Sequence, residues 1–164
     1  MENIVLVGLA DLNVCEAPDA IKTLALGSCV GVVLFEPVSK VAGMAHIMLP
    51  DSNLIVNNKN DNKAKFADTG IETLIGLMEN KFNIDKRRLR AKIAGGAQMF
   101  NFSTKNDMLR IGDRNVEATK RNLALHNIPV VNEDVGDNYG RTITFYPDTG
   151  QLHIVSHGRP SKVI

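Results

Sequence analysis

The sequence predicts an α+β fold with a largely antiparallel or mixed sheet. Three observations favour this class: short apolar segments outnumber helical ones, most connections between them are of hairpin length, and two amphipathic helices interrupt the series. A chain of 164 residues suits one domain over residues 1–164, because this length buries a substantial core without a metal or disulfide bonds.

The individual elements follow from apolar periodicity and from turn residues. A helix is expected over about 66–81, where Asp68 is the predicted N-cap, and a second over about 114–126, where Asp113 is the predicted cap. Between strands and helices, the segment 51–65 is rich in Asn, Asp and Lys and is expected to be a surface loop. The predicted strands cover residues 4–9, 21–26, 30–35, 41–49, 91–94, 141–146 and 151–156.

The composition excludes several classes of protein. Nineteen Lys and Arg residues against 18 Asp and Glu residues give a net charge of +1, which provides no strong field for nucleic acid or an anionic membrane. No apolar run reaches the length of a spanning helix, and the N-terminus lacks the basic region of a secretory signal. We therefore expect a cytoplasmic protein with no nucleic-acid partner, no membrane insertion, and no metal or other cofactor. Its two cysteines are expected to be free thiols.

One of these cysteines lies at a break in regular structure. The stretch TLALGSCVGVVLF (23–35) is mostly an apolar strand pattern, but Gly-Ser-Cys interrupts it at Cys29. The turn residues from Glu36 to Ser39 predict a hairpin with the following strand. If Glu36 pairs with Ser39, Cys29 lies directly opposite His46, where Cβ atoms are about 4.5–5.5 Å apart. The sequence therefore predicts contact between a thiol and an imidazole.

Such a pair suits nucleophilic catalysis. An adjacent imidazolium lowers the thiol pKa from about 8.5, and the imidazole can then protonate a leaving amine and activate water. Gly27 lets the backbone bend, Gly31 leaves space beside the thiol, and the N–H groups of Ser28 and Cys29 could form an oxyanion hole. A cysteine in an apolar sheet is, however, usually inert core. The residues alone leave both interpretations open.

Six separated segments carry a resemblance to a known family. They are TLALGSCVG (23–31) with GMAHIMLP (43–50), KFADT (65–69), KIAGGAQMF (92–100), IGDRN (111–115) and EDVGDNYGR (133–141). In this order they closely resemble the CheD family of chemoreceptor glutamine deamidases. The departures are mild: Gln98 stands where Asn or Ser is commoner, and Asp137 where Gly is often found.

The resemblance implies a catalytic triad, in which Cys29 is the nucleophile, His46 the base and acid, and Thr23 the group that orients the imidazole. The implied reaction is hydrolysis of selected glutamine side chains to glutamate on methyl-accepting chemotaxis receptors through a thioester, and hydrolysis of glutamyl methyl esters is also allowed. The implied fold is a β-sandwich flanked by helices, similar to the catalytic domains of deamidating bacterial toxins. The implied partners are the cytoplasmic helices of the receptors and the CheC-type phosphatase of the chemotaxis response regulator.

Two other functions remain open at this stage. A thiol peptidase or transferase would use the same acyl-enzyme step, and residue types alone do not separate it from a deamidase. In the second alternative, the protein is a binding module that mainly regulates the CheC-type phosphatase.

Other residues that could bind or react have simpler interpretations. Cys15 lies in a polar, loop-like stretch and is expected to be structural or incidental. His126 ends a predicted helix, where a cation suits the helix dipole. His153 and His157 share strand parity and could meet at a metal, but a solvated strand face is the favoured interpretation.

Three further features have competing interpretations. The Gly95-Gly96 pair predicts tight backbone packing rather than a phosphate cradle, because the rest of a P-loop is missing. Met99, Phe100 and Phe102 are predicted to be core, with docking of a receptor helix as the alternative. The basic run 86–90 is expected to be a solvated turn, with attraction to acidic receptor helices as the alternative.

Overall fold

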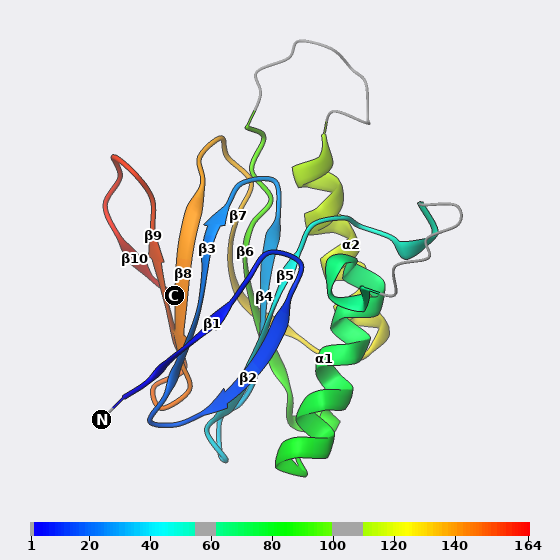
Figure 1. Ribbon diagram of the computed structural model, residues 1–164, viewed down its shortest axis with the longest axis vertical. Coiled ribbons are helices and arrows are strands. Elements are labelled where there is room, and N and C mark those ends of the chain that lie inside the picture. Colours follow the sequence, from blue (N-terminus) through cyan, green and yellow to red (C-terminus); the bar gives the residue numbers. More distant parts are fainter. Residues whose placement is uncertain (1, 55–61, 100–109) are drawn as a thin grey trace.

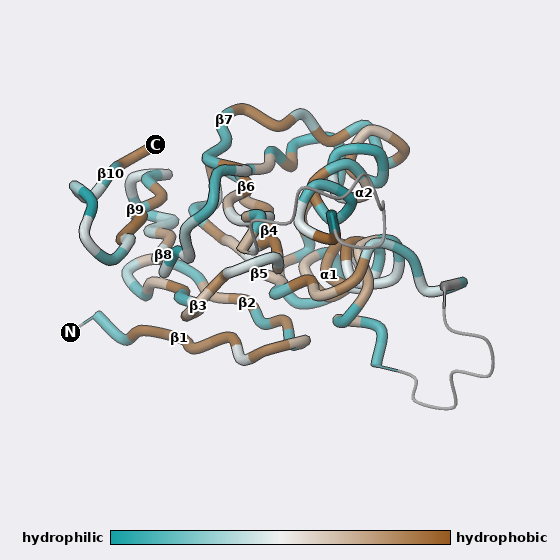
Figure 2. The backbone as a smooth tube through the Cα atoms, turned by 90° about the horizontal axis from the view of Figure 1, so that it is seen from above, coloured by the Kyte–Doolittle hydropathy of each residue, from teal (hydrophilic) through white to brown (hydrophobic). Residues whose placement is uncertain are grey.

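The computed structural model describes residues 2–54, 62–99 and 110–164. Two five-stranded sheets pack face to face, and two α-helices lie against the far side of one of them (Figure 1). Figure 2, viewed from above, shows the resulting three layers, with both helices on the same side of the sheets. The predicted α+β class and the β-sandwich with flanking helices are confirmed, although the helices flank one side only.

The two sheets differ in position. The outer sheet, which has no α-helix against its exposed face, runs in the order β1 (Ile4–Val7), β3 (Ala20–Leu26), β8 (Arg141–Tyr146), β9 (Gln151–Val155) and β10 (Lys162–Val163). The central sheet runs in the order β2 (Leu12–Glu16), β5 (Val41–Ile47), β4 (Val30–Glu36), β6 (Arg90–Gly95) and β7 (Val130–Val135). Pairing is antiparallel except for β1 with β3 and β6 with β7, which are parallel.

Strand β4 lies in the middle of the central sheet and is buried on both faces. Val33 and Phe35 face the core between the two sheets, whereas Val32 and Leu34 face the core beneath the helices. A strand covered on both faces reads as a continuous apolar run, and this explains why its sequence shows no polar alternation.

Both predicted helices are confirmed as α1 (Ala67–Phe82) and α2 (Ile111–Leu125), but neither has the predicted cap. The N-cap position of α1 is Phe66, and Asp68 instead accepts hydrogen bonds from the backbone N–H and the hydroxyl of Ser52 at 3.0 and 2.6 Å. Helix α2 begins three residues early, and Asp113 lies in its first turn beside Arg110. Both carboxylates remain where the positive end of the helix dipole favours them.

Three strands are absent from the predictions: β2, β7 and β10. Their sequences carry little apolar alternation, because all three run along the edges of their sheets. Cys15, predicted to lie in a loop, is buried in β2.

The β4–β5 hairpin is confirmed, but its predicted register is wrong. Glu36 pairs with Val41 rather than Ser39, and His46 therefore lies opposite Gly31 rather than Cys29. The loop holds four residues because Lys40 adopts a left-handed conformation with φ 57° and donates its N–H to the Glu36 carbonyl. This adds two residues to the predicted turn. A shift of two keeps each side chain on its predicted face.

Two helical glycines make a matched test of the packing. Gly112 in α2 touches the backbone of the Gly95-Gly96 turn so closely that a Cβ would lie 2.6 Å from the Gly96 carbonyl oxygen, whereas a Cβ on Gly76 in α1 would meet nothing within 4 Å. We expect Gly112→Ala to destabilise the protein by roughly 1–3 kcal/mol, because backbone atoms cannot rotate away. Gly76→Ala should stabilise it by about 0.4–1 kcal/mol. Urea unfolding measures both, and equal midpoints for the two variants would contradict this packing.

Candidate active site

Cys29 lies in the short connection between the two sheets. Strand β3 of the outer sheet ends at Leu26, the residues Gly27-Ser28-Cys29 cross over, and β4 of the central sheet begins at Val30. The Cys29 side chain is partly buried against the core between the sheets, and its thiol is free. The connection therefore places a thiol at one end of the sandwich, where the sheets meet.

The carbonyl groups of this connection are all held by neighbouring elements. Ala97 N–H donates to the Gly27 carbonyl at 2.9 Å, and Gly96 N–H donates to the Cys29 carbonyl at 2.8 Å. Gly95 and Gly96 both have positive φ, and a Cβ on Gly95 would collide with the Cys29 carbonyl. The prediction that Gly95-Gly96 serves close backbone packing is confirmed.

The middle carbonyl, that of Ser28, is held by a side chain that the sequence did not single out. Asn115 of α2 donates its amide Nδ2 to the Ser28 carbonyl at 2.9 Å and to the Met48 carbonyl at 3.0 Å. The available signal was its spacing: Asn115, Thr119 and Leu123 share one face of α2, and all three are fully buried. A polar residue on the core face of a helix predicts a buried hydrogen bond, because its polar group needs a partner there.

His46 and Thr23 meet across the two sheets. The Thr23 hydroxyl lies 2.7 Å from Nδ1 of His46 and 2.8 Å from the backbone carbonyl of Val7, and both side chains are almost fully buried. The Val7 carbonyl can only accept, so it takes the single hydroxyl proton of Thr23. Nδ1 of His46 must then donate to the hydroxyl oxygen, and the neutral ring keeps its lone pair on Nε2.

Nε2 of His46 is buried and has no hydrogen-bond partner among the described residues. Extending the β4–β5 register by one residue places Cys29 opposite Met48 and diagonal to His46, on the same face. Diagonal neighbours lie about 7–8 Å apart at Cα, and long side chains bridge that distance. The structure thus brings Thr23 and His46 into contact and places Cys29 as a near neighbour, without a bond from its thiol to the ring.

Gly31, directly opposite His46, does not leave open space beside the thiol as predicted. A Cβ at this position would lie 2.5 Å from Cδ1 of Ile143 and 3.1 Å from Cδ1 of Leu26. The glycine instead lets the outer sheet approach closely. This approach brings Thr23 within reach of His46, because Thr23 pairs with Ile143.

Burial shifts both titratable groups of the site toward their neutral forms. It raises the pKa of the Cys29 thiol above its usual value and lowers the pKa of the His46 imidazole. The predicted lowering of the thiol pKa by an imidazolium is therefore wrong for the resting site. The ligand-free pair is a neutral thiol beside a neutral imidazole.

The remaining side chains of interest lie elsewhere. Burial raises the pKa of Cys15 to about 12, so this thiol is unreactive near neutral pH. His126 caps α2, but its pKa is lowered by burial and by Lys86, whose Nζ lies 2.9 Å from Nδ1; the predicted cation is therefore wrong. His153 of β9 packs on Tyr146 of β8, as expected for a strand face.

Met99 is half exposed, contrary to the core prediction, and its side chain lies over Gly27 in the connection that contains Cys29. Phe100 and Phe102, like residues 55–61 of the predicted surface loop, lie outside the described residues. The basic residues at the start of the run 86–90 lie in a surface turn as predicted, with Arg87 paired to Asp85 at 2.9 Å. Leu89 within the run is buried, and Arg90 begins β6.

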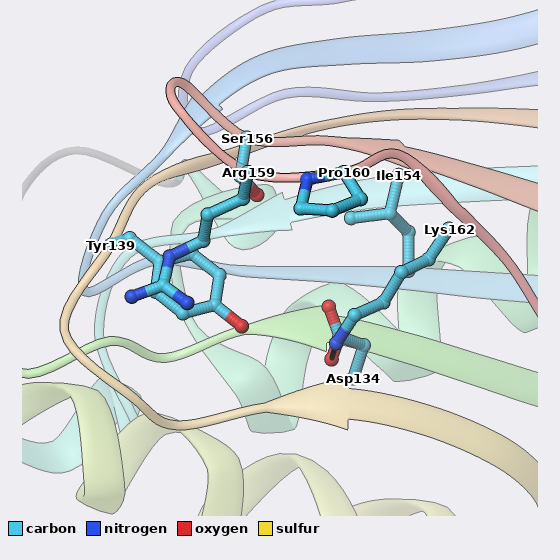
Figure 3. A pocket seen from close by; sticks show the side chains of 7 residues that line it. All are labelled: Asp134, Tyr139, Ile154, Ser156, Arg159, Pro160 and Lys162. Atoms are coloured by element: carbon cyan, nitrogen blue, oxygen red, sulfur yellow. Dashed lines mark hydrogen bonds and ion pairs between the residues drawn. The ribbon is translucent and has the colours of Figure 1, made fainter.

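A separate small pocket of about 130 Å³ lies between β7 and the β9–β10 hairpin (Figure 3). Lys162 and the buried Arg141 both bind Asp134, at 3.1 and 3.0 Å, and Arg159 stacks on Tyr139. Burial would raise the pKa of Asp134, but the hydrogen bonds from these two cations outweigh it and lower the pKa. These contacts fasten the two sheets together at their edge.

Two general features complete the site's setting. Within residues 2–54, 62–99 and 110–164, no three His, Cys, Asp or Glu side chains are grouped so that they could hold a metal ion. No helix in that part of the chain is long and apolar enough to cross a membrane.

Comparison with known proteins gives the family. A model described as "CheD chemotactic sensory transduction" matches residues 48–156. A probable chemoreceptor glutamine deamidase CheD from Lachnoclostridium phytofermentans is 56% identical over 164 residues, which is 100% of both chains. This chain belongs to the CheD family. The chemoreceptor glutamine deamidase CheD of Halalkalibacterium halodurans is 54% identical and covers 94% of each chain, and that of Bacillus subtilis is 44% identical and covers 98% of this chain and 96% of its own.

The family model begins two residues after His46, whereas these CheD relatives extend over the segment that contains Thr23, Cys29 and His46. A crystal structure of the Bacillus licheniformis hypothetical protein YfiH aligns with a TM-score of 0.42 at 14% identity, over 70% of this chain and 46% of that chain. That alignment supports no conclusion about fold or function.

The neutral state of the site can be tested by alkylation. We expect labelling of Cys29 by iodoacetamide to rise with pH to a midpoint above the ordinary thiol value of about 8.5, because burial disfavours the thiolate. Cys15 should remain unlabelled over the same range. Peptide mapping by mass spectrometry separates the two thiols. A Cys29 midpoint well below 8 would instead indicate a thiolate–imidazolium pair.

Proposed function

We propose that the whole chain, 1–164, is a deamidase that hydrolyses glutamine side chains of chemoreceptors to glutamate. In this proposal Cys29 is the nucleophile, His46 the general base and acid, and Thr23 the residue that orients the imidazole. The observation that carries it is the Thr23–His46 hydrogen bond, which leaves Nε2 of a buried imidazole without a partner on the face that Cys29 shares. The names of the CheD relatives supply the substrate class.

The first half of the reaction transfers the acyl group to the enzyme. The Cys29 sulfur attacks the carbon of the substrate's side-chain amide, and Nε2 of His46 takes the thiol proton. The amide oxygen becomes an oxyanion, which the N–H groups of Ser28 and Cys29 can stabilise. The imidazolium then gives its proton to the amide nitrogen, the C–N bond breaks, and ammonia leaves. A thioester on Cys29 remains.

The second half returns the enzyme to its starting state. Water attacks the thioester carbon while Nε2 of His46 takes one of its protons. The C–S bond breaks and the sulfur recovers the proton from the imidazolium. The product is a glutamate side chain, and the sum is one amide and one water converted to one carboxylic acid and one ammonia. A glutamyl methyl ester would follow the same steps with methanol as the leaving group.

A neutral resting pair fits this sequence of proton transfers. The lowered pKa of His46 keeps the base unprotonated at neutral pH, so it can accept the thiol proton during attack. During attack the thiolate forms only next to the imidazolium that stabilises it. Thr23 contributes by holding the ring in the tautomer whose lone pair faces the thiol's side of the sandwich.

The partners and location in this proposal rest on the family resemblance and on membership of the CheD family. The substrates would be the cytoplasmic helices of methyl-accepting receptors, and the regulator would be a CheC-type phosphatase. The location would be the cytoplasm, where those receptor helices lie.

Incubation with a purified receptor cytoplasmic fragment tests the function. We expect a mass gain of about 1 Da per modified glutamine with the chain intact, because an amide becomes a carboxylate. Cys29→Ala should reduce this gain to background while the protein stays folded. Cys15→Ala is the matched control, since it removes the other thiol, which is buried and distant in sequence, and it should remain active.

Three outcomes would contradict the proposal. Chain scission at the modified sites would indicate a peptidase instead. Full activity in Cys29→Ala would remove this thiol from the mechanism. No mass gain with the wild-type chain, together with tight binding of a CheC-type phosphatase, would favour the binding module.

A further inference from the structure

Asn115 occupies an unusual place behind the nucleophile. It lies one turn into α2, is fully buried, and uses both of its amide hydrogens. One goes to the carbonyl of Ser28, the residue before the nucleophile, and the other to the carbonyl of Met48, two residues after His46. A single side chain therefore ties the connection that carries the thiol to the strand end that carries the base.

The bond to Ser28 also determines where an N–H group points. In a planar trans peptide the C=O and the following N–H point in opposite directions. Because Asn115 holds the Ser28 carbonyl toward α2, the N–H of Cys29 is turned away from α2. By the same geometry, the bond from Ala97 N–H to the Gly27 carbonyl turns the N–H of Ser28 away from Ala97. Neither N–H donates to another described residue, so both remain available to a substrate oxygen.

The helix can approach this closely for a local reason. Gly112 and Gly96 touch backbone to backbone, and any side chain at Gly112 would meet the carbonyl groups of Gly96 and Ala97. Asn115 lies three residues after Gly112 and thus reaches the Ser28 and Met48 carbonyls. Its own Oδ1 is buried without a partner among the described residues. The two bonds to the carbonyl groups therefore come with one buried, unpaired acceptor, which costs free energy.

We propose that Asn115 is a positioning residue for acyl transfer. It aims the N–H of Cys29 at the oxyanion without touching the substrate. This inference rests on the proposed deamidase function. It assigns to α2 a role in transition-state stabilisation that acts through the backbone N–H of Cys29.

Two reactions of the Cys29 thiol distinguish this role from a general loss of structure. Deamidation passes through an oxyanion and needs the aimed N–H, whereas alkylation by iodoacetamide displaces iodide and forms no oxyanion at a carbonyl. We expect Asn115→Ala and the nearly isosteric Asn115→Asp to lose roughly 10²-fold in kcat, the scale for one oxyanion donor. KM should change little, and the alkylation rate of Cys29 should stay near that of the wild type.

Thr119→Val provides the matched control. Thr119 lies one turn further along the same buried face of α2, and its hydroxyl has no partner among the described residues. The isosteric change alters a buried polar group without removing a hydrogen bond, so kcat should be unchanged. A parallel loss of activity in this variant would mean that any disturbance of α2 impairs the enzyme.

The outcomes distinguish this inference from the function on which it rests. An inactive wild-type chain defeats the proposed function itself. An active wild type with full kcat in a folded Asn115 variant overturns the role of Asn115, as does an equal loss of deamidation and of alkylation. If both variants fail to fold, NMR of the wild type bound to a peptide with a glutamate-semialdehyde side chain provides the test. The NMR signal of the Cys29 amide proton should move downfield, because this N–H donates a hydrogen bond to the hemithioacetal oxygen. An unmoved signal contradicts the proposal.

Discussion

The hydrogen bond between Thr23 and His46 is the interaction on which the rest of the site depends. It joins the two sheets across their shared core, and the Val7 carbonyl fixes its direction by claiming the hydroxyl proton. A donor-to-acceptor chain of this kind leaves the imidazole a single neutral form, with its lone pair on Nε2. The close approach of the sheets at Gly31 makes the bond possible, so the packing of the sandwich also determines the tautomer of His46.

The site is held from two directions. The outer sheet sets the tautomer of His46 from one side, while α2 and the Gly95-Gly96 turn hold the carbonyl groups of the Cys29 connection from the other. Burial favours the neutral forms of the Cys29 thiol and the His46 imidazole. In the proposed reaction, proton transfer and attack can therefore occur together once a substrate amide arrives. Because the folded protein already holds these groups in place, the entropy of ordering them is lost on folding rather than during the reaction.

Local patterns in the sequence predicted what local physics controls. The apolar face of α1, the continuous strand β4 and the interruption at Cys29 were all visible, and so was the hairpin that follows. The register was not, because it depended on Lys40 adopting a left-handed conformation that no local rule required. The contact of Thr23 with His46 came from the family resemblance alone, since it joins different sheets. The role of Asn115 depends on how α2 docks, and no spacing along the chain determines that.

The tautomer of His46 tests the central claim most directly. Nitrogen-15 NMR of the ring reports which nitrogen carries the proton in the wild-type chain at neutral pH, and Thr23→Val removes the hydroxyl while keeping the shape of the side chain. The structure predicts a neutral imidazole with its proton on Nδ1, and a loss of that preference in the variant. A proton on Nε2, or a fully protonated imidazolium at neutral pH, would contradict the account.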